Sequence, residues 1–226
     1  MKIKRYDTEF EVVDDTICPE FWSKHPEWEA YNYRKIREHA FSCHTFVSVG
    51  TWIGPFTLFA AKHYERVIGF EPESLAFNEV SRNVILNNYS NVELNNVAVA
   101  SFNGTLQLGE CIACPKGMSR TSFLYDGDKF SVKCETLRKI YADRGLTTRT
   151  CLKIDIEGGE YNLFDDIDFF IQNKPTLIVE CHQEYLNPDQ TEHLRRGLEN
   201  VAKHYDVPFL LEPIRNTHCY LESTYE

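Results

Sequence analysis

Residues 150–161, TCLKIDIEGGEY, decide the fold because a strand-like apolar run ends there in carboxylates and glycines. The apolar run predicts a strand. Asp155 and Glu157 interrupt it, and two glycines and Glu160 follow at once. A carboxylate is costly to bury without a partner. We therefore expect Asp155 and Glu157 to face a cleft at the end of this strand and not the core.

Strand-like and helix-like segments alternate on both sides of this stretch. Strands are predicted at residues 44–50, 66–72, 91–100, 150–159 and 176–182. Helices are predicted at residues 54–65, 73–88, 135–145, 160–173 and 188–205. This order predicts an α/β fold in which a mostly parallel sheet carries helices on both faces. Two further strand-like segments, 207–214 and 217–223, follow the last helix.

A chain of 226 residues suffices for one domain with a sizeable core. We predict a helical N-terminal cap at residues 1–44 and a single α/β domain at residues 45–226. The net charge is −10 and no long run of Lys and Arg occurs, so no nucleic-acid partner is expected. No apolar run reaches the length of a membrane span, and the N-terminus lacks an apolar signal core. We therefore expect a cytoplasmic protein with no membrane insertion.

The cysteines are expected to be reduced thiols, since eight of them occur in a chain without a secretion signal. Cys111 and Cys114 have the spacing of a metal clip. Tetrahedral zinc needs two further ligands, so this pair alone favours a loop with two free thiols.

The end of the first strand of the sheet predicts a nucleotide site. Gly50 and Gly54 lie in the turn from this strand into a helix, where glycine lets a ligand approach the backbone. Glu71 ends the next strand, about twenty residues later, where nucleotide-binding βαβ units place the acid that binds a ribose diol. The loop lacks the third glycine of the dinucleotide fingerprint. An adenosyl ligand without a pyrophosphate therefore fits it better than a dinucleotide.

Five segments between residues 45 and 185 stand in a characteristic order: VSVGTWIGPFTLFAA, VIGFEPESLAFNEVSRNVILNN, NVELNNVAVASFNGTLQL, LKIDIEGGEY and IVECHQEYL. In order and spacing they resemble the FkbM-type methyltransferases, which are class I enzymes that use S-adenosylmethionine. The resemblance implies a Rossmann-like, seven-stranded, mostly parallel sheet with an antiparallel last strand. The two closing segments suit that ending. It also implies that residues 45–226 form the S-adenosylmethionine-binding domain.

The family's cofactor positions fall at the ends of the first strands and in Asp155. The glycine loop receives the methionine part, the acid at the second strand holds the ribose, and the turn after the third strand lies near adenine. The implied cofactor-binding residues are Ser48, Gly50, Thr51, Trp52, Ile53, Gly54, Glu71, Pro72, Asn96, Val97, Ala98 and Asp155. Ser48 departs from the usual aspartate, which removes a negative charge near a cationic ligand. Trp52 departs from the usual asparagine, and its large ring shapes or crowds the pocket.

The predicted catalytic group comes from two strand ends, because ligands of open parallel sheets bind beyond the carboxyl ends of the strands. Asp155 and Glu157 end the fourth strand. Glu180 and His182 end the fifth. We predict His182 as the base that removes the proton of an acceptor hydroxyl, with Glu180 holding the imidazole. Asp155 either orients the hydroxyl or serves as the base if its pKa is raised. In a second version Asp155, Glu180 and His182 bind Mg²⁺ or Mn²⁺, which acidifies the hydroxyl.

Acceptors in the FkbM-type family include hydroxyls of sugars and of secondary metabolites. Aromatic residues near the N-terminus, which suit a sugar ring, are Trp22, Trp28, Tyr31 and Tyr33. We therefore predict O-methylation of a sugar or glycan. The alternatives are a lipid or polyketide alcohol as acceptor, an inactive methyltransferase-like binding domain, or a nicotinamide-dependent oxidoreductase on a similar sheet. Family members also occur beside, or fused to, glycosyltransferases, so such an enzyme is an expected partner.

Overall fold

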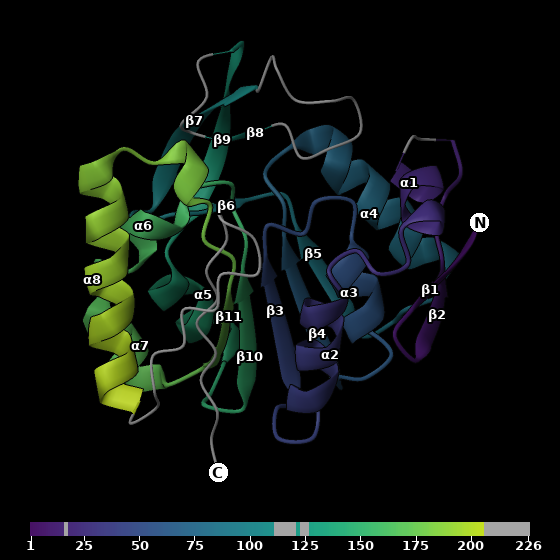
Figure 1. The fold of residues 1–226 in the computed structure, drawn as a ribbon, viewed down its shortest axis with the longest axis horizontal. Helices are drawn as coiled ribbons and strands as arrows, with labels where there is room; N and C mark the ends of the chain where they lie inside the picture. The colour runs from purple at the N-terminus through teal and green to yellow at the C-terminus, as the bar shows by residue number, and fades with distance from the viewer. Residues whose placement is uncertain (16–17, 111–120, 123–126, 206–226) are drawn as a thin grey trace.

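A five-stranded parallel sheet lies at the centre of the protein in the computed structural model, which describes residues 1–15, 18–110, 121–122 and 127–205 (Figure 1). Across the sheet the strands are β11 (Thr176–Val179), β10 (Thr150–Ile154), β3 (Thr45–Val49), β4 (Arg66–Phe70) and β5 (Val92–Asn95). From β3 the chain moves to β4 and β5, and it returns later to β10 and β11 on the other side of β3. The strand order therefore reverses between β3 and β10. Open α/β sheets bind their ligands at such a switch point.

Helices cover both faces of this sheet, as the alternating sequence pattern predicts (Figure 1). One face carries α5 (Leu137–Arg144), α6 (Glu160–Leu163), α7 (Ile167–Asn173) and α8 (Pro188–Tyr205). The other carries α2 (Ala30–His39), α3 (Pro55–Ala60) and α4 (Ser74–Leu86). The helix predicted at 160–173 is thus divided into α6 and α7, because the carboxylate of Asp166 accepts from the backbone N–H of Phe169 and caps a new helix. The α/β class is confirmed.

Each strand supplies two cores, because successive residues of a strand point to opposite faces of the sheet. Val47 joins the core beneath α5 to α8, and Phe46 joins the core beneath α2 to α4. Ser48 and Lys153 pair in register on β3 and β10, and their parity places them on the same face as Phe46. A lysine therefore enters the core at the carboxyl end of the sheet.

The predicted helical cap at residues 1–44 begins instead with a β-hairpin. β1 (Lys2–Arg5) and β2 (Thr8–Glu11) pair antiparallel, and α1 (Cys18–Lys24) and α2 follow. Ile3 and Phe10 are buried in the core beneath α2 to α4, so the segment packs onto the sheet. Buried and exposed residues alternate along β1, and this period of two is the strand signal that a helical interpretation overlooks.

The strand predicted at 91–100 is also two strands, which belong to different sheets. β5 ends at Asn95, and β6 (Ala98–Val99) joins a second sheet with β9 (Lys129–Glu135), β7 (Gly104–Glu110) and β8 (Thr121–Ser122). Between them Asn96 donates from its side chain to the carbonyl oxygens of Glu71 and Pro72. These hydrogen bonds hold the turn that carries the chain from one sheet to the other.

Some expectations fall outside the described residues. These are the closing strands at 207–214 and 217–223, and the pair Cys111 and Cys114. Within the described part the parallel sheet has five strands. The cysteines that are free and buried there are Cys43, Cys134, Cys151 and Cys181. No helix in the described part is long and apolar enough to cross a membrane.

Replacing Gly50 with alanine is expected to destabilise the protein by about 3 kcal/mol. Gly50 has a φ of +82°, and an added Cβ would lie 1.8 Å from the carbonyl oxygen of Asp155. Gly145→Ala is the control, since its φ is +61° but no atom lies within 4 Å of an added Cβ. Only the left-handed backbone opposes that change, at about 1–2 kcal/mol. Urea denaturation compares the two, and equal losses would contradict the close approach of the Gly50 and Asp155 backbones.

Candidate active site

The glycine loop (residues 50–54), which follows β3, and the acidic segment (residues 155–160), which follows β10, lie side by side at the switch point. The backbone N–H of Asp155 donates to the carbonyl of Val49 at 3.0 Å, which extends the pairing of β3 and β10 by one residue. An added Cβ on Gly50 would collide with the carbonyl oxygen of Asp155. The two segments predicted to receive the cofactor and the acceptor are therefore in contact.

Glu71, the acid predicted to hold the ribose, is buried and turned toward the glycine loop. Its Oε2 accepts from the backbone N–H of Trp52 at 2.7 Å, and its Oε1 accepts from the backbone N–H of Glu73 at 2.9 Å. Trp52 has a φ of +49°, so its backbone is left-handed where it donates to Glu71. Burial raises the pKa of Glu71 to about 7, although both backbone hydrogen bonds act to lower it.

The other predicted cofactor residues fall into two groups. Asn96 lies against Glu71 and Pro72 through its side chain, and Val97 and Ala98 continue from it. The turn after β5 is therefore beside the turn after β4. The remaining positions are buried in or next to the glycine loop, and they are Ser48, Thr51, Ile53 and Gly54. The structure thus brings the predicted cofactor residues together at three neighbouring strand ends.

Lys153, which the sequence analysis did not single out, lies fully buried at the centre of the site. Its Nζ donates to Oδ2 of Asp155 at 2.6 Å and lies 3.7 Å from Oε2 of Glu180. It also lies 4.3 Å from the centre of the Phe56 ring on α3. The sequence does carry a signal for this pairing. Lys153 stands two residues before Asp155 in LKID, and residues two apart in a strand point to the same face.

The charges in this group determine one another. Burial disfavours the ammonium, but the carboxylates of Asp155 and Glu180 outweigh it and raise the pKa of Lys153. Burial also acts against ionised Asp155, yet Lys153 and His182 hold the pKa of its carboxyl below the ordinary value. Burial, reinforced by the charge of Asp155, raises the pKa of Glu180 well above the ordinary value. Asp155 is therefore the carboxylate that balances the buried lysine.

The N-terminal segment reaches this group through α2. The Nδ2 atom of Asn32 donates to Oε2 of Glu29 at 2.6 Å and to Oε2 of Glu180 at 3.3 Å. Asn32 is fully buried. The segment before the sheet therefore contributes a side chain to the candidate site, although the sequence analysis assigned it only to acceptor binding.

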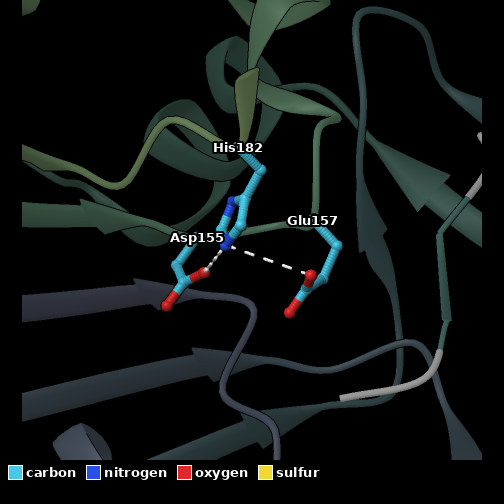
Figure 2. A group of neighbouring side chains, drawn as sticks. All are labelled: Asp155, Glu157 and His182. Atoms are coloured by element: carbon cyan, nitrogen blue, oxygen red, sulfur yellow. Dashed lines mark ion pairs between the residues drawn. The ribbon is translucent and has the colours of Figure 1, made fainter. Parts of the chain in front are cut away.

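His182 lies between three carboxylates. Its Nδ1 lies 3.1 Å from Oε1 of Glu160, and its Nε2 lies 3.7 Å from Oδ1 of Asp155 and 3.9 Å from Oε2 of Glu157. Figure 2 shows the ring directed between Asp155 and Glu157. Burial acts against a charged ring, but the hydrogen bond and charge of Glu160, with the two other carboxylates, raise the pKa of His182 well above its ordinary value. A protonated imidazole is a poor proton acceptor.

The group with metal-binding geometry differs in one member from the predicted set of Asp155, Glu180 and His182. The structure groups Asp155, Glu157 and His182, whose ligand atoms lie within 4.8 Å of one another. Glu180 instead points toward Lys153 and Asn32. It has the parity of Ile178, which faces the core beneath α2 to α4, so the pleat of β11 places it on the face of the sheet that carries Lys153.

The aromatic residues predicted to contact a sugar are mostly structural. Trp22 and Tyr33 are buried in the core beneath α2 to α4, and Tyr31 lies under Arg34. Trp28 is half-buried, and its ring lies 6.3 Å from the half-buried ring of Trp52 in the glycine loop. The buried ring of Trp22 lies 5.9 Å from the same ring, so of the predicted four both Trp22 and Trp28 lie next to the predicted cofactor site, and of these two only Trp28 is partly exposed.

The sequence of this site matches a known family. Residues 48–205 fit the model of the methyltransferase FkbM domain. The chain belongs to the FkbM methyltransferase family. The match begins at Ser48 and covers both the glycine loop and the strand ends that carry Asp155 and His182. This FkbM methyltransferase is thus a member of the S-adenosylmethionine-dependent methyltransferases. No curated protein matches its sequence.

Solved structures with a fold similar to that of this chain include several methyltransferases. An rRNA methylase from Streptococcus thermophilus has 10% identity, with 74% of this chain and 76% of that chain covered and a TM-score of 0.47. A precorrin-6y C5,15-methyltransferase from Geobacter metallireducens GS-15 has 14% identity, with 87% of this chain and 78% of that chain covered and a TM-score of 0.48. An O-methyltransferase from Bacillus cereus, in complex with S-adenosylhomocysteine, has 12% identity, with 86% of this chain and 78% of that chain covered and a TM-score of 0.47. At such identities the likeness concerns the fold alone.

The expectation that nucleic acid is excluded as a partner is wrong. The solved structures with a similar fold include the rRNA methylase and a tRNA (uracil-54, C5)-methyltransferase from Pyrococcus abyssi. A net charge of −10 describes the whole chain, whereas nucleic-acid binding depends on how charge is distributed over one face. The total charge therefore does not exclude an RNA acceptor.

Replacing Lys153 with methionine is expected to destabilise the FkbM methyltransferase by about 3–5 kcal/mol at pH 7, because the half-buried carboxylate of Asp155 loses its cationic partner. Adding Asp155→Asn should recover part of this loss, since no unpaired charge then remains. Urea denaturation of the single and double variants measures both effects.

The control for this pair is Lys139→Met. Lys139 pairs with Asp143 on the exposed side of α5, and an exposed pair contributes about 1 kcal/mol or less. Equal losses for Lys139→Met and Lys153→Met would contradict the buried ion pair. So would a double variant that is less stable than Lys153→Met alone.

Proposed function

We propose that the protein transfers the methyl group of S-adenosylmethionine to a hydroxyl oxygen of a sugar or glycan. The observation that carries this proposal is the contact between the glycine loop and the segment of Asp155, in a chain of the FkbM family. It joins a cofactor-binding turn to a group of ionisable side chains. Methyl transfer to oxygen requires both within a few ångströms of each other.

In this proposal the carboxylate of Glu71 binds the ribose diol. A ribose hydroxyl donates to a carboxylate oxygen, and the ionised form of Glu71 is the stronger acceptor. The two backbone N–H groups that donate to Glu71 hold its carboxylate in place at the end of β4, where the proposal puts the ribose. The glycine loop would hold the methionine part, and the carboxylate of Asp155 beside that loop would favour the sulfonium cation.

The reaction is an in-line displacement at the methyl carbon. The acceptor oxygen forms a bond to the methyl carbon while the bond from sulfur to that carbon breaks, and the electron pair stays on sulfur. S-adenosylhomocysteine leaves, and the hydroxyl proton passes to the group of Asp155, Glu157 and His182. Within this group we assign the proton to a carboxylate, because the surroundings of His182 favour a ring that is already protonated.

A sugar acceptor is supported by the half-buried rings of Trp28 and Trp52, since aromatic faces suit the apolar face of a sugar ring. Trp28 also stacks against Phe56, the ring beneath Lys153, with the ring centres 6.3 Å apart. An acceptor on Trp28 would therefore lie one ring away from the buried Lys153 group.

Affinity for S-adenosylhomocysteine is expected to fall about tenfold from pH 8 to pH 6, because the pKa of Glu71 is about 7 and its ionised form binds the ribose. Burial raises this pKa above the ordinary value, so protonation sets in as the pH falls through 7. Glu71→Gln is expected to weaken binding about tenfold to a hundredfold at pH 8 and to remove this pH dependence. Calorimetric titration at both pH values measures these effects.

Glu65→Gln is the control for this titration, because Glu65 is exposed and lies at the opposite end of β4. It should bind as the wild type does. Absence of binding at millimolar ligand, or an affinity that Glu71→Gln leaves unchanged, would contradict the ribose contact.

Transfer of a labelled methyl group is expected with hydroxyl acceptors from a panel of sugars and glycans. Asp155→Asn is expected to lower the rate at least about a hundredfold, whereas Asp165→Asn, at an exposed aspartate, should keep it. The panel includes RNA and long-chain alcohols as competing classes. Transfer to RNA or to alcohols alone would overturn the sugar acceptor, and cofactor binding without any transfer would favour a binding domain.

A further inference from the structure

Asp155, Glu157 and His182 converge at the carboxyl ends of β10 and β11 (Figure 2). One ligand atom from each lies within 4.8 Å of the others. From Nε2 of His182 the distances are 3.7 Å to Oδ1 of Asp155 and 3.9 Å to Oε2 of Glu157. Ligand atoms placed about 2.1 Å from one ion lie roughly 3–4 Å apart. The two distances from Nε2 thus match the spacing of donors around a shared ion, and the two carboxylate oxygens lie within 4.8 Å of each other.

The imidazole is oriented by a fourth side chain on its other edge. Glu160 is fully buried, and its Oε1 accepts from the backbone N–H of Ile156 at 2.8 Å. The same oxygen lies 3.1 Å from Nδ1 of His182, so Nδ1 is the nitrogen that carries a proton. Nε2 is then directed at the two carboxylates. Histidines that bind metals usually have their other nitrogen held in this way.

Asp155 divides its two oxygens between different partners. Oδ2 accepts from the buried Lys153, whereas Oδ1 faces His182. Lys153 therefore fixes the position of Asp155, to which the side chain of Glu180 is also hydrogen-bonded, with Oδ1 on the side of His182. The side chains of Asp155 and Glu157 are 21% and 18% exposed, against 7% for His182. The group is thus open on the carboxylate side, where an ion and a hydroxyl can enter.

We propose that Asp155, Glu157 and His182 bind one divalent first-row transition-metal ion, for which Mn²⁺ is the probe. A mixed set of imidazole and carboxylate donors favours such an ion over Mg²⁺ and Ca²⁺, which prefer oxygen ligands alone. Three protein ligands leave positions open on the ion. The acceptor hydroxyl occupies one of them. This use of the ion rests on the proposed function, whereas ion binding itself does not.

With Asp155 and Glu157 bound to the ion, the ion takes over the part of the carboxylate base: coordination lowers the pKa of the acceptor hydroxyl, so its proton passes to water at neutral pH. The hydroxyl oxygen then forms the bond to the methyl carbon, and the carbon–sulfur bond breaks with its electron pair on sulfur. The products are the methyl ether and S-adenosylhomocysteine, and the ion keeps its charge throughout. The ion displaces the proton that the carboxylates favour on Nε2, so His182 is then a neutral ligand, with Nε2 toward the ion and Nδ1 toward Glu160.

Titration of the EDTA-treated chain with MnCl₂, followed by calorimetry and by the EPR signal of free Mn²⁺, tests the site. Saturable binding of one ion per chain is expected. Glu157→Gln and His182→Gln should each weaken it at least about tenfold, since each removes a ligand. Glu157→Gln is the principal variant, because Asp155 also pairs with the buried Lys153 and its loss affects folding.

Two control variants sharpen the result. Glu65→Gln changes an exposed glutamate and should bind Mn²⁺ as the wild type does. Glu180→Gln should weaken binding less than Glu157→Gln, and the reverse order would overturn the assignment of Glu157. Thermal unfolding of every variant shows that each compared chain is folded.

No saturable binding of Mn²⁺ or Zn²⁺ at millimolar concentration would overturn the metal site, as would equal affinities in the wild type and both ligand variants. Full methyl transfer in EDTA would overturn the role of the ion in the reaction and leave the proposed function standing. Mn²⁺ binding that depends on Glu157 and His182, in a chain that transfers no methyl group, would support the metal site and count against the proposed function.

Discussion

The buried ammonium of Lys153 is the constraint on which the site depends. Transfer of an ammonium from water into a protein core costs several kcal/mol, and only a well-placed counter-charge offsets this. Asp155, which follows β10, supplies that charge with its Oδ2 atom 2.6 Å from the ammonium. Glu180, which follows β11, lies 3.7 Å from the same ammonium. The pairing therefore fixes the ends of two neighbouring strands relative to each other. It also turns one oxygen of Asp155 toward the sheet and leaves the other for the switch point.

The same ammonium joins the N-terminal segment to the site. Asn32 of α2 donates to Glu180, and the ring of Phe56 on α3 packs against Lys153 from the same side of the sheet. Residues from three distant parts of the chain thus meet around one charge. Removal of the N-terminal segment would expose this charge to water and leave Glu180 without the amide that holds it. The hairpin and α2 are accordingly part of the architecture of the site.

The strand ends could be predicted from sequence, whereas the pairing among their side chains could not. Gly50, Glu71 and Asp155 each follow an apolar run directly, and a parallel sheet brings such ends to one edge. The choice between Glu157 and Glu180 beside His182 depends on the turn after β10. Glu157 has a φ of +54° and Gly158 a φ of +92°, so the chain bends back there. No periodicity in the sequence reports that bend.

The two departures from the family pattern act differently in this fold. Trp52 binds Glu71 through its backbone N–H, so the change from asparagine keeps the contact that positions the acid. Its ring meets those of Trp22 and Trp28, with ring centres 5.9 and 6.3 Å away, and so packs the glycine loop against the N-terminal segment. Ser48 is buried in register with Lys153, and an aspartate there would add a carboxylate to the face that Lys153 shares with Asp155. With serine at this position, Asp155 is the closest counter-ion of Lys153 in the described structure. The negative charge that balances Lys153 therefore belongs to the residue whose backbone contacts Gly50 of the glycine loop.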